Sequence, residues 1–227
     1  RIAQDDRLAV VEPGVTNEAL QQALAPHGFF WAPDPGSAPW CTVGGNLACN
    51  AGGPRALKYG ATRDNVLGLR AVAGTGAGFV AGTHTTKDSP GYDLTRLLVG
   101  SEGTLALITE ATLKLTRLPA RQSVLLFAVP DIAAVLKLFR DARKAPFAIA
   151  AYEFFTDKCL ARVARHRKGR APFEATHPCY VLLEIEDATD DVIETWVTSL
   201  FERELISDGT LAQNSSQAAE LWTLREG

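Results

Sequence analysis

The segment from residue 33 to residue 60, PDPGSAPWCTVGGNLACNAGGPRALKYG, constrains the fold of this chain more than any other part of it. It holds six glycines, four prolines and two asparagines, which interrupt nearly every apolar run. Glycine is used where the backbone takes a positive φ or approaches a ligand closely, and proline stiffens the chain and removes an amide hydrogen. We therefore predict an ordered, irregular loop here, with neither a helix nor a strand.

Two parts of this loop, TVGGN at 42–46 and NAGG at 50–53, are predicted to offer backbone amides that no side chain crowds. Such amides suit a phosphate or the polar edge of a flat cofactor ring, and an ordered surface loop without a ligand is the alternative. A second glycine-framed segment, GSEGTLALITE at 100–110, indicates a tight turn when it is taken alone. GTGAG at 74–78 is not followed by the helix that a dinucleotide fingerprint needs, so we predict a hairpin turn.

The composition is that of a globular protein, with 227 residues of which 46% are hydrophobic and a formal net charge of −3. The mild acidity argues against nucleic acid as a partner. No apolar run reaches membrane-spanning length and no signal peptide pattern opens the chain, which indicates a cytoplasmic protein, with peripheral membrane attachment as the alternative. The chain has no methionine and begins at Arg1, so we expect a processed chain or a piece of a longer protein.

The four cysteines show neither metal-ligand nor redox spacing, and the four histidines are scattered along the chain. We therefore expect reduced thiols, no metal site and no histidine-based catalysis within these residues. Arg225 follows Leu221 and Trp222 on a predicted helix. It reads either as a surface arginine or as a guanidinium fork for a carboxylate beside a buried aromatic ring.

The pattern of elements changes near residue 119. Before it we predict a strand at 7–14, a helix at 16–28 capped by Thr16 and ended by Gly28, a hairpin at 65–82, a short helix at 91–100, and one or two strands at 103–116. After it we predict strands at 123–129, 148–155, 179–186 and 206–213, and helices at 131–143, 156–166, 189–204 and 215–226. Without the helix at 156–166, the order is β-α-β-β-α-β, the split ferredoxin-like arrangement with helices on one face of an antiparallel sheet.

Several long motifs resemble a known family. They are VEPGVTNEALQQALAPHGFFWAPDPGS, CTVGGNLACNAGG, KYGATRDNVLGL and GYDLTRLLVGSEGTLALITEATLKL. They resemble FAD-linked oxidases of the vanillyl-alcohol-oxidase type, in the branch of D-2-hydroxy-acid dehydrogenases that act on D-2-hydroxyglutarate, D-lactate or glycolate. YEFFTDKCLARVARH, APFEATHPCYVLLEIE and ISDGTLAQNSSQAAELWTLRE look like the cap domain of the D-2-hydroxyglutarate dehydrogenases, so the likeness extends over nearly the whole chain.

The resemblance implies an α+β fold, with part of an FAD-binding domain at 1–119, without its first phosphate loop, and an incomplete ferredoxin-like cap domain at 120–227. It also implies which residues contact FAD. Pro35, Gly36 and Ser37 would border the flavin, and Thr42, Gly44, Gly45, Asn46, Asn50, Gly52 and Gly53 would line the ring and the ribityl-pyrophosphate. Gly100, Ser101, Glu102, Gly103, Thr104 and Ile108 would hold the adenine side or the pyrophosphate, chiefly through the backbone.

The activity that the resemblance implies is hydride transfer from the α-carbon of a D-2-hydroxy acid to the flavin, giving a 2-oxo acid. Arg225 would pair with the substrate carboxylate, while the catalytic base, and any divalent metal, would come from residues outside this chain, so these residues alone should be inactive. FAD would be non-covalent, since no histidine or cysteine stands at a linkage position. An electron-transfer protein or a quinone would accept the electrons, and a homodimer is compatible with the family. The alternatives are a flavin oxidase or reductase of the same fold acting on another alcohol, and a non-catalytic subunit.

Overall fold

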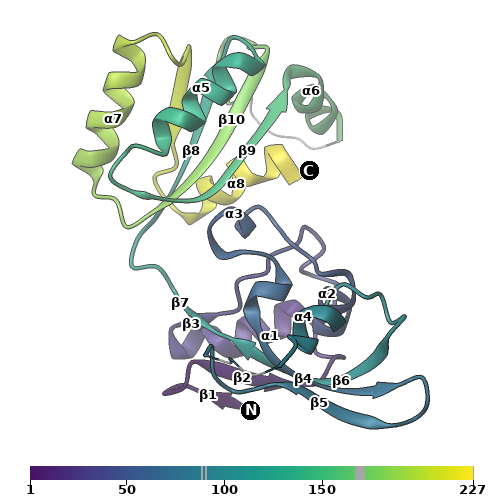
Figure 1. Cartoon of the computed structure of the whole chain (residues 1–227). Coiled ribbons are helices and arrows are strands. Elements are labelled where there is room, and N and C mark those ends of the chain that lie inside the picture. The colour runs from purple at the N-terminus through teal and green to yellow at the C-terminus, as the bar shows by residue number, and fades with distance from the viewer. Residues whose placement is uncertain (88, 90, 167–171, 227) are drawn as a thin grey trace. The chain divides into compact units, whose positions relative to one another are not determined.

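The computed structural model describes every residue except 88, 90, 167–171 and 227, and it divides into two compact units, Arg1–Leu118 and Pro119–Gly227 (Figure 1). Each unit has its own sheet and its own buried core.

The first unit is built on a five-stranded antiparallel sheet with the strand order β1-β2-β6-β4-β5. Its strands are β1 (Ile2–Ala3), β2 (Leu8–Val11), β4 (Val66–Ala73), β5 (Gly78–Gly82) and β6 (Ala106–Lys114). A separate short pair joins β3 (Phe29–Phe30) to β7 (Thr116–Arg117). The predicted hairpin at 65–82 and the predicted strands at 7–14 and 103–116 are confirmed.

Helix α1 (Asn17–Leu24) begins after Thr16, as the sequence predicts, and ends four residues before Gly28. The Thr16 hydroxyl accepts a hydrogen bond from the amide of Ala19 at 3.2 Å, which caps the first turn. A 3₁₀ turn, η1 (Ala25–His27), continues the helix to Gly28, whose φ of 74° ends it. Leu20 and Leu24 face the core, so the helix packs onto the sheet along one side.

The prediction that residues 33–60 form no helix is wrong, because α2 (Val43–Cys49) and α3 (Ala56–Tyr59) lie within them. The Thr42 hydroxyl caps α2 by accepting from the amide of Gly45 at 3.1 Å. Val43 and Leu47, one helical turn apart, are completely buried in the core of the unit. Tertiary packing of these two side chains outweighs the low helix propensity of the glycines between them.

Helices cover one face of the sheet in the first unit. On β4, Leu69 and Ala71 are buried while Arg70 between them is exposed, the alternation of a strand with one covered face. The buried side chains meet those of α1, α2 and α4 (Leu94–Leu98) around Trp31, whose ring nitrogen donates to the carbonyl of Asn65 at 3.1 Å. This core holds the loops between the helices in fixed positions.

The second unit has a four-stranded antiparallel sheet with the order β11-β8-β10-β9. Its elements are β8 (Gln122–Val129), α5 (Ile132–Ala142), β9 (Ala148–Thr156), α6 (Asp157–His166), β10 (Cys179–Glu186), α7 (Asp190–Glu202), β11 (Asp208–Leu211) and α8 (Ser215–Glu226). The chain order and the strand order are those of a ferredoxin-like fold, so the α+β prediction is confirmed.

Both faces of this second sheet are covered. Helices α5 and α7 pack on the face that carries Val181, Leu183 and Ile185 of β10. Helices α6 and α8 pack on the opposite face, which carries Tyr180 and Leu182 (Figure 1). The prediction of helices on a single face therefore needs correction, because α6 and α8 form a second helical layer.

Candidate functional site

The two glycine segments singled out in the sequence lie against each other in the first unit. The amide of Gly100 donates to the carbonyl of Leu47 at 2.9 Å, and the amide of Glu102 donates to that of Ala48 at 3.0 Å. The loop at 100–104 therefore closes the C-terminal end of α2. It makes this turn with three residues at positive φ, at Gly100 (88°), Glu102 (52°) and Gly103 (76°).

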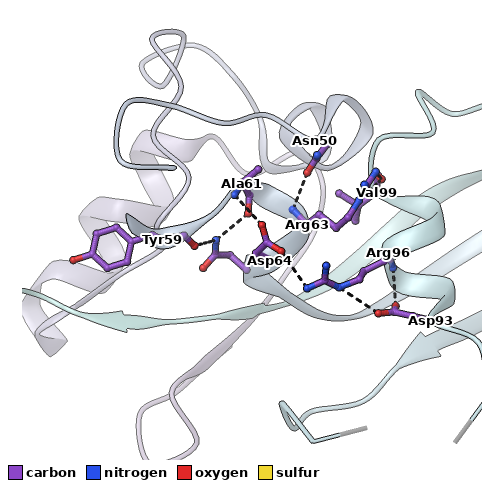
Figure 2. Close-up of polar contacts among 9 residues, drawn as sticks. Asn50, Tyr59, Ala61, Arg63, Asp64, Asp93, Arg96 and Val99 are labelled. Carbon is purple, nitrogen blue, oxygen red and sulfur yellow. Dashed lines mark hydrogen bonds and ion pairs between the residues drawn. The ribbon is translucent and has the colours of Figure 1, made fainter. Parts of the chain in front are cut away.

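Arg63, whose role no sequence motif indicated, joins these segments. It lies on the 3₁₀ turn η2 (Thr62–Asn65), and its Nη2 donates to the carbonyl of Val99 at 2.7 Å (Figure 2). Its own amide donates to Oδ1 of Asn50 at 2.9 Å, where Asn50 ends α2 with a φ of 49°. One residue thus contacts the ends of both glycine segments.

A second polar chain joins η2 to α4. Arg96 pairs with Asp64 at 3.1 Å, and its amide donates to Oδ1 of Asp93 at 2.8 Å, which caps α4 (Figure 2). Asp64 also accepts from the amide of Ala61 at 3.1 Å. These side chains are about half exposed, so the pairs fix geometry more than they stabilise the fold.

The turn at 35–37 is joined to the same region by an ion pair. Arg55 Nη1 lies 3.0 Å from Oδ2 of Asp34, and the amide of Ala38 donates to the carbonyl of Pro35 at 2.7 Å. The structure thus brings together four predicted segments, residues 35–37, 42–46, 50–53 and 100–104, which we call the glycine cradle. Ile108 is not part of the glycine cradle; it lies on β6, where it pairs with Ala71 and packs against the core.

The backbone amides of α2 are bonded within the protein, which corrects the prediction of open amides at 42–46. The amides of Val43 and Gly44 donate to the carbonyls of Val15 and Pro13, at 2.8 and 2.9 Å. Those of Gly45 and Asn46 donate to the hydroxyl and carbonyl oxygens of Thr42, at 3.1 and 3.0 Å. The sequence could not show this, because Pro13 and Val15 are distant from α2 along the chain.

The glycines of the cradle fall into two groups according to what a side chain would meet. A Cβ added at Gly44 would lie 2.6 Å from Cβ of Pro13, and one at Gly100 would lie 2.8 Å from Nη2 of Arg63. At Gly53 it would lie 2.4 Å from the Asp34 carbonyl oxygen. These glycines are required by the protein's own packing.

The second group borders open space. Among the residues that the structure describes, an added Cβ would meet nothing closer than 3.4 Å at four positions, Gly36, Gly45, Gly52 and Gly103. The side chain of Asn46 is 2% exposed, and its Nδ2 has no hydrogen-bond partner within the described part of the chain. Bare backbone surfaces beside a buried amide donor without a partner fit a flat, polar-edged cofactor such as FAD.

In the second unit, Arg225 lies on α8 and pairs with Glu153 of β9. Its Nε and Nη2 each lie 2.8 Å from the same oxygen, Oε2 of Glu153. One turn earlier, Nε1 of Trp222 donates to Oε2 of Glu184 at 3.0 Å, and Glu184 is 1% exposed. Arg225 thus lies one helical turn from the half-buried Trp222, and Glu153 is a partner of its guanidinium that the sequence did not indicate.

No helix in the described part of the chain combines the length and the apolar character that a membrane span requires. All four cysteines, at positions 41, 49, 159 and 179, are free thiols.

Comparison with protein families places both units. A model of an FAD binding domain matches residues 1–81, and a model of the C-terminal domain of FAD linked oxidases matches residues 118–227. The chain is 40% identical over 226 residues to D-2-hydroxyglutarate dehydrogenase of Xanthomonas citri pv. viticola, covering 98% of this chain and 47% of the relative. Mitochondrial D-2-hydroxyglutarate dehydrogenase of Bos taurus is 35% identical over 222 residues, with 96% and 41% covered.

Glycolate oxidase subunit GlcD of Bacillus subtilis is 38% identical over 193 residues, covering 85% of this chain and 40% of that protein. The chain therefore spans about half the length, or less, of the relatives that it matches. Among solved structures, an alkyldihydroxyacetonephosphate synthase has a TM-score of 0.71 at 22% identity, covering 100% of this chain and 44% of that one, which shows a shared fold.

Proposed function

We propose that this chain, whose two units match models of an FAD binding domain and of the C-terminal domain of FAD linked oxidases, is the part of a D-2-hydroxy-acid dehydrogenase that holds FAD and the substrate carboxylate. The observation that carries the proposal is the closure of the glycine cradle by Gly100, Glu102 and Arg63. FAD supplies the redox chemistry of such an enzyme, by taking a hydride from the α-carbon of the hydroxy acid.

In this proposal the cradle holds FAD without a covalent bond. The open glycines at 36, 45, 52 and 103 allow the flat and extended parts of the cofactor to approach the backbone. Nδ2 of Asn46 is a buried donor for a polar edge of the cofactor. Ser101 and Thr104 line the loop that closes α2, where the Thr104 hydroxyl donates to the Ser101 carbonyl.

Arg225 binds the carboxylate of the substrate by charge-assisted hydrogen bonds, which fix its orientation as well as its position. A substrate held by its carboxylate presents its α-carbon in one direction, and this orientation contributes to the rate. The base that takes the hydroxyl proton, and any divalent metal, are supplied by the rest of the whole protein.

The test uses the full-length parent protein and has two stages. First, the purified protein is expected to show flavin absorption bands, or to gain them and a higher Tm when FAD is added. Second, D-2-hydroxyglutarate, D-lactate or glycolate should bleach those bands without oxygen, while the L-enantiomers of the first two should not. A colourless protein that does not respond to FAD contradicts the cofactor assignment, and bleaching only by other alcohols or lactones contradicts the substrate class.

The finer partners are part of the same proposal. Electrons leave the reduced cofactor to an electron-transfer protein or a quinone, the whole enzyme forms a homodimer, and it works in the cytoplasm. Stopped-flow reoxidation with ubiquinone analogues and with flavoprotein acceptors would identify the acceptor class. Light scattering and imaging of a tagged full-length protein would test the homodimer and the compartment.

A further inference from the structure

We propose that Glu153 positions Arg225, by holding one edge of its guanidinium so that the other edge faces the substrate carboxylate. The inference rests on the proposed function, because it assumes that Arg225 binds a carboxylate. It adds a residue for which neither the motifs nor the family resemblance gave a role.

The guanidinium donors of Arg225 form two pairs, and Glu153 occupies one of them. A guanidinium offers five N–H donors in a planar fork, with one pair along the Nε–Nη2 edge and another along the Nη1–Nη2 end. Nε and Nη2 of Arg225 both lie 2.8 Å from Oε2 of Glu153, so the first edge is occupied. The Nη1–Nη2 end points away from Glu153, and the Arg225 side chain is 41% exposed, so a ligand carboxylate can reach it.

The glutamate is itself fixed in place. Glu153 lies in the middle of β9, in register with Leu182 of β10, and its side chain is 23% exposed. Strand pairing on the β10 side therefore sets where its carboxylate stands. A carboxylate on a sheet is a firmer support for a long arginine side chain than a residue of a surface loop would be.

The helix that carries Arg225 is held at a second point. Nε1 of Trp222 donates to Glu184, which also accepts from Nε2 of Gln122 at 2.6 Å. Trp222 and Arg225 are three residues apart, so they lie on the same side of α8, facing β10 and β9. The two contacts together fix the position of α8 along the sheet and the direction of Arg225.

A second guanidinium lies near Arg225. On α6, which packs beside α8, the pKa of the Cys159 thiol is lowered by a hydrogen bond from the Thr156 hydroxyl, and further by the charges of Arg162 and Arg225. The guanidinium groups of Arg162 and Arg225 therefore both lie near this thiol, and Glu153 is paired with Arg225. A second guanidinium near Arg225 favours an anionic ligand.

The test compares an acid with its ester in the full-length, FAD-loaded enzyme. The ratio of kcat/KM for the D-2-hydroxy acid that is turned over fastest to kcat/KM for its 1-methyl ester measures how strongly the carboxylate is used. Glu153→Ala should lower this ratio roughly tenfold, since the guanidinium loses its orientation. Glu153→Gln should restore most of the ratio, because its amide oxygen still accepts from Nε or Nη2.

The matched control is Asp141→Ala, which breaks the ion pair between Asp141 of α5 and Arg203, the residue that follows α7. The side chains of Arg203 and Asp141 are 47% and 21% exposed, close to the 41% and 23% of Arg225 and Glu153. This variant should lose stability but keep the acid-to-ester ratio. A merely structural role for Glu153 would make both variants behave in this way.

An unchanged ratio in Glu153→Ala overturns the inference, and so does an equal fall in Asp141→Ala. If Glu153→Ala does not fold, Arg225→Lys decides the question. Lysine can keep the ion pair with Glu153 but has no second pair of donors for a substrate carboxylate. A Lys variant with the wild-type ratio then contradicts the inference. An FAD-loaded wild-type enzyme that turns over no D-2-hydroxy acid contradicts the proposed function, and the inference with it.

Discussion

At the scale of the residue, two neighbouring glycines of α2 serve different purposes. An added Cβ at Gly44 would meet Pro13 at 2.6 Å, whereas one at Gly45 would meet only the Thr42 hydroxyl, at 3.4 Å. We expect Gly44→Ala to destabilise the apoprotein by about 1–3 kcal/mol through overpacking. Gly45→Ala should leave its stability unchanged or raise it by up to about 1 kcal/mol, because alanine favours the helix.

The affinity for FAD should rank the same two variants in the reverse order, with Gly45→Ala the weaker binder although it is the more stable protein. The Gly45→Ala methyl group projects from the open side of α2, so the Kd for FAD should rise at least about tenfold if the cofactor lies there. Urea denaturation of the apoprotein and quenching of flavin fluorescence measure the two quantities. A Gly45→Ala protein that binds FAD as the wild type does would remove Gly45 from the cofactor site.

Arg63 gives a second residue-scale prediction. Arg63→Gln removes the donors that hold the Val99 carbonyl, so the loop at 100–104 should lose its fixed position and FAD should bind roughly tenfold more weakly. The Kd for FAD of Arg63→Lys should lie between those of the wild type and Arg63→Gln, because lysine keeps one donor. Arg70→Gln is the control, since the Arg70 pair with Glu110 is exposed and lies on the sheet. Equal Kd values for FAD in the Arg63 and Arg70 variants would contradict this role.

The sequence alone indicated which positions of the cradle need glycine. It did not indicate which neighbouring residues make glycine necessary at several of these positions. Glycine at 44, 53 and 100 was attributed to a ligand, yet these three positions meet Pro13, Asp34 and Arg63. A sequence shows that a bare backbone is needed but not which neighbour needs it, because that neighbour is distant along the chain. Arg63 and Glu153 were missed for the same reason.

At the scale of the element, α5 and α7 are joined by Asp141. Its carboxylate accepts from Nε1 of Trp196 at 2.9 Å and from Nη1 of Arg203 at 2.5 Å. The hydrogen bond from Arg203 is the largest cause that lowers the pKa of Asp141 below its ordinary value of 3.8. Asp141→Asn should therefore destabilise the second unit by about 1–2 kcal/mol near neutral pH.

The pH dependence of this variant has a definite sign. A carboxyl whose pKa is lowered by folding contributes stability that is fully present above its unfolded pKa and is lost as the pH falls through its folded pKa. The difference in unfolding free energy between wild type and Asp141→Asn should thus be constant from about pH 5 to 7 and shrink below about pH 4. A difference that stays constant down to pH 2 would contradict the assignment.

The elements with local signals agree with the sequence predictions. Thr16 caps α1, Gly28 ends the 3₁₀ turn that continues it, Asp131 caps α5, and the turn at 74–76 joins β4 to β5. Helix α2 also has a cap, Thr42, but its glycines argued against a helix, and the burial of Val43 and Leu47 stabilises it. The second layer of α6 and α8 was missed because the order of elements does not state which face of a sheet a helix covers.

At the scale of the whole molecule, each compact unit has a core of its own. Residues 119–227 contain two buried clusters, one on each face of the sheet, and form a domain of ordinary size. We expect this segment, expressed alone, to unfold in a single cooperative transition and to show no shift in Tm with FAD. The full-length parent should show such a shift. Loss of cooperative unfolding in the isolated segment would mean that the first unit completes its core.

The internal hydrogen bonds of the cradle have a consequence for how the proposed flavoenzyme is made in the cell. Since α2 and the loop at 100–104 bond to each other and to Pro13 and Val15, this part of the chain takes its shape without help from a ligand. Flavin insertion is then a late step of biogenesis. Cells grown short of riboflavin should accumulate a folded, protease-resistant apoprotein, which recovers full activity within minutes of FAD addition even when protein synthesis is blocked.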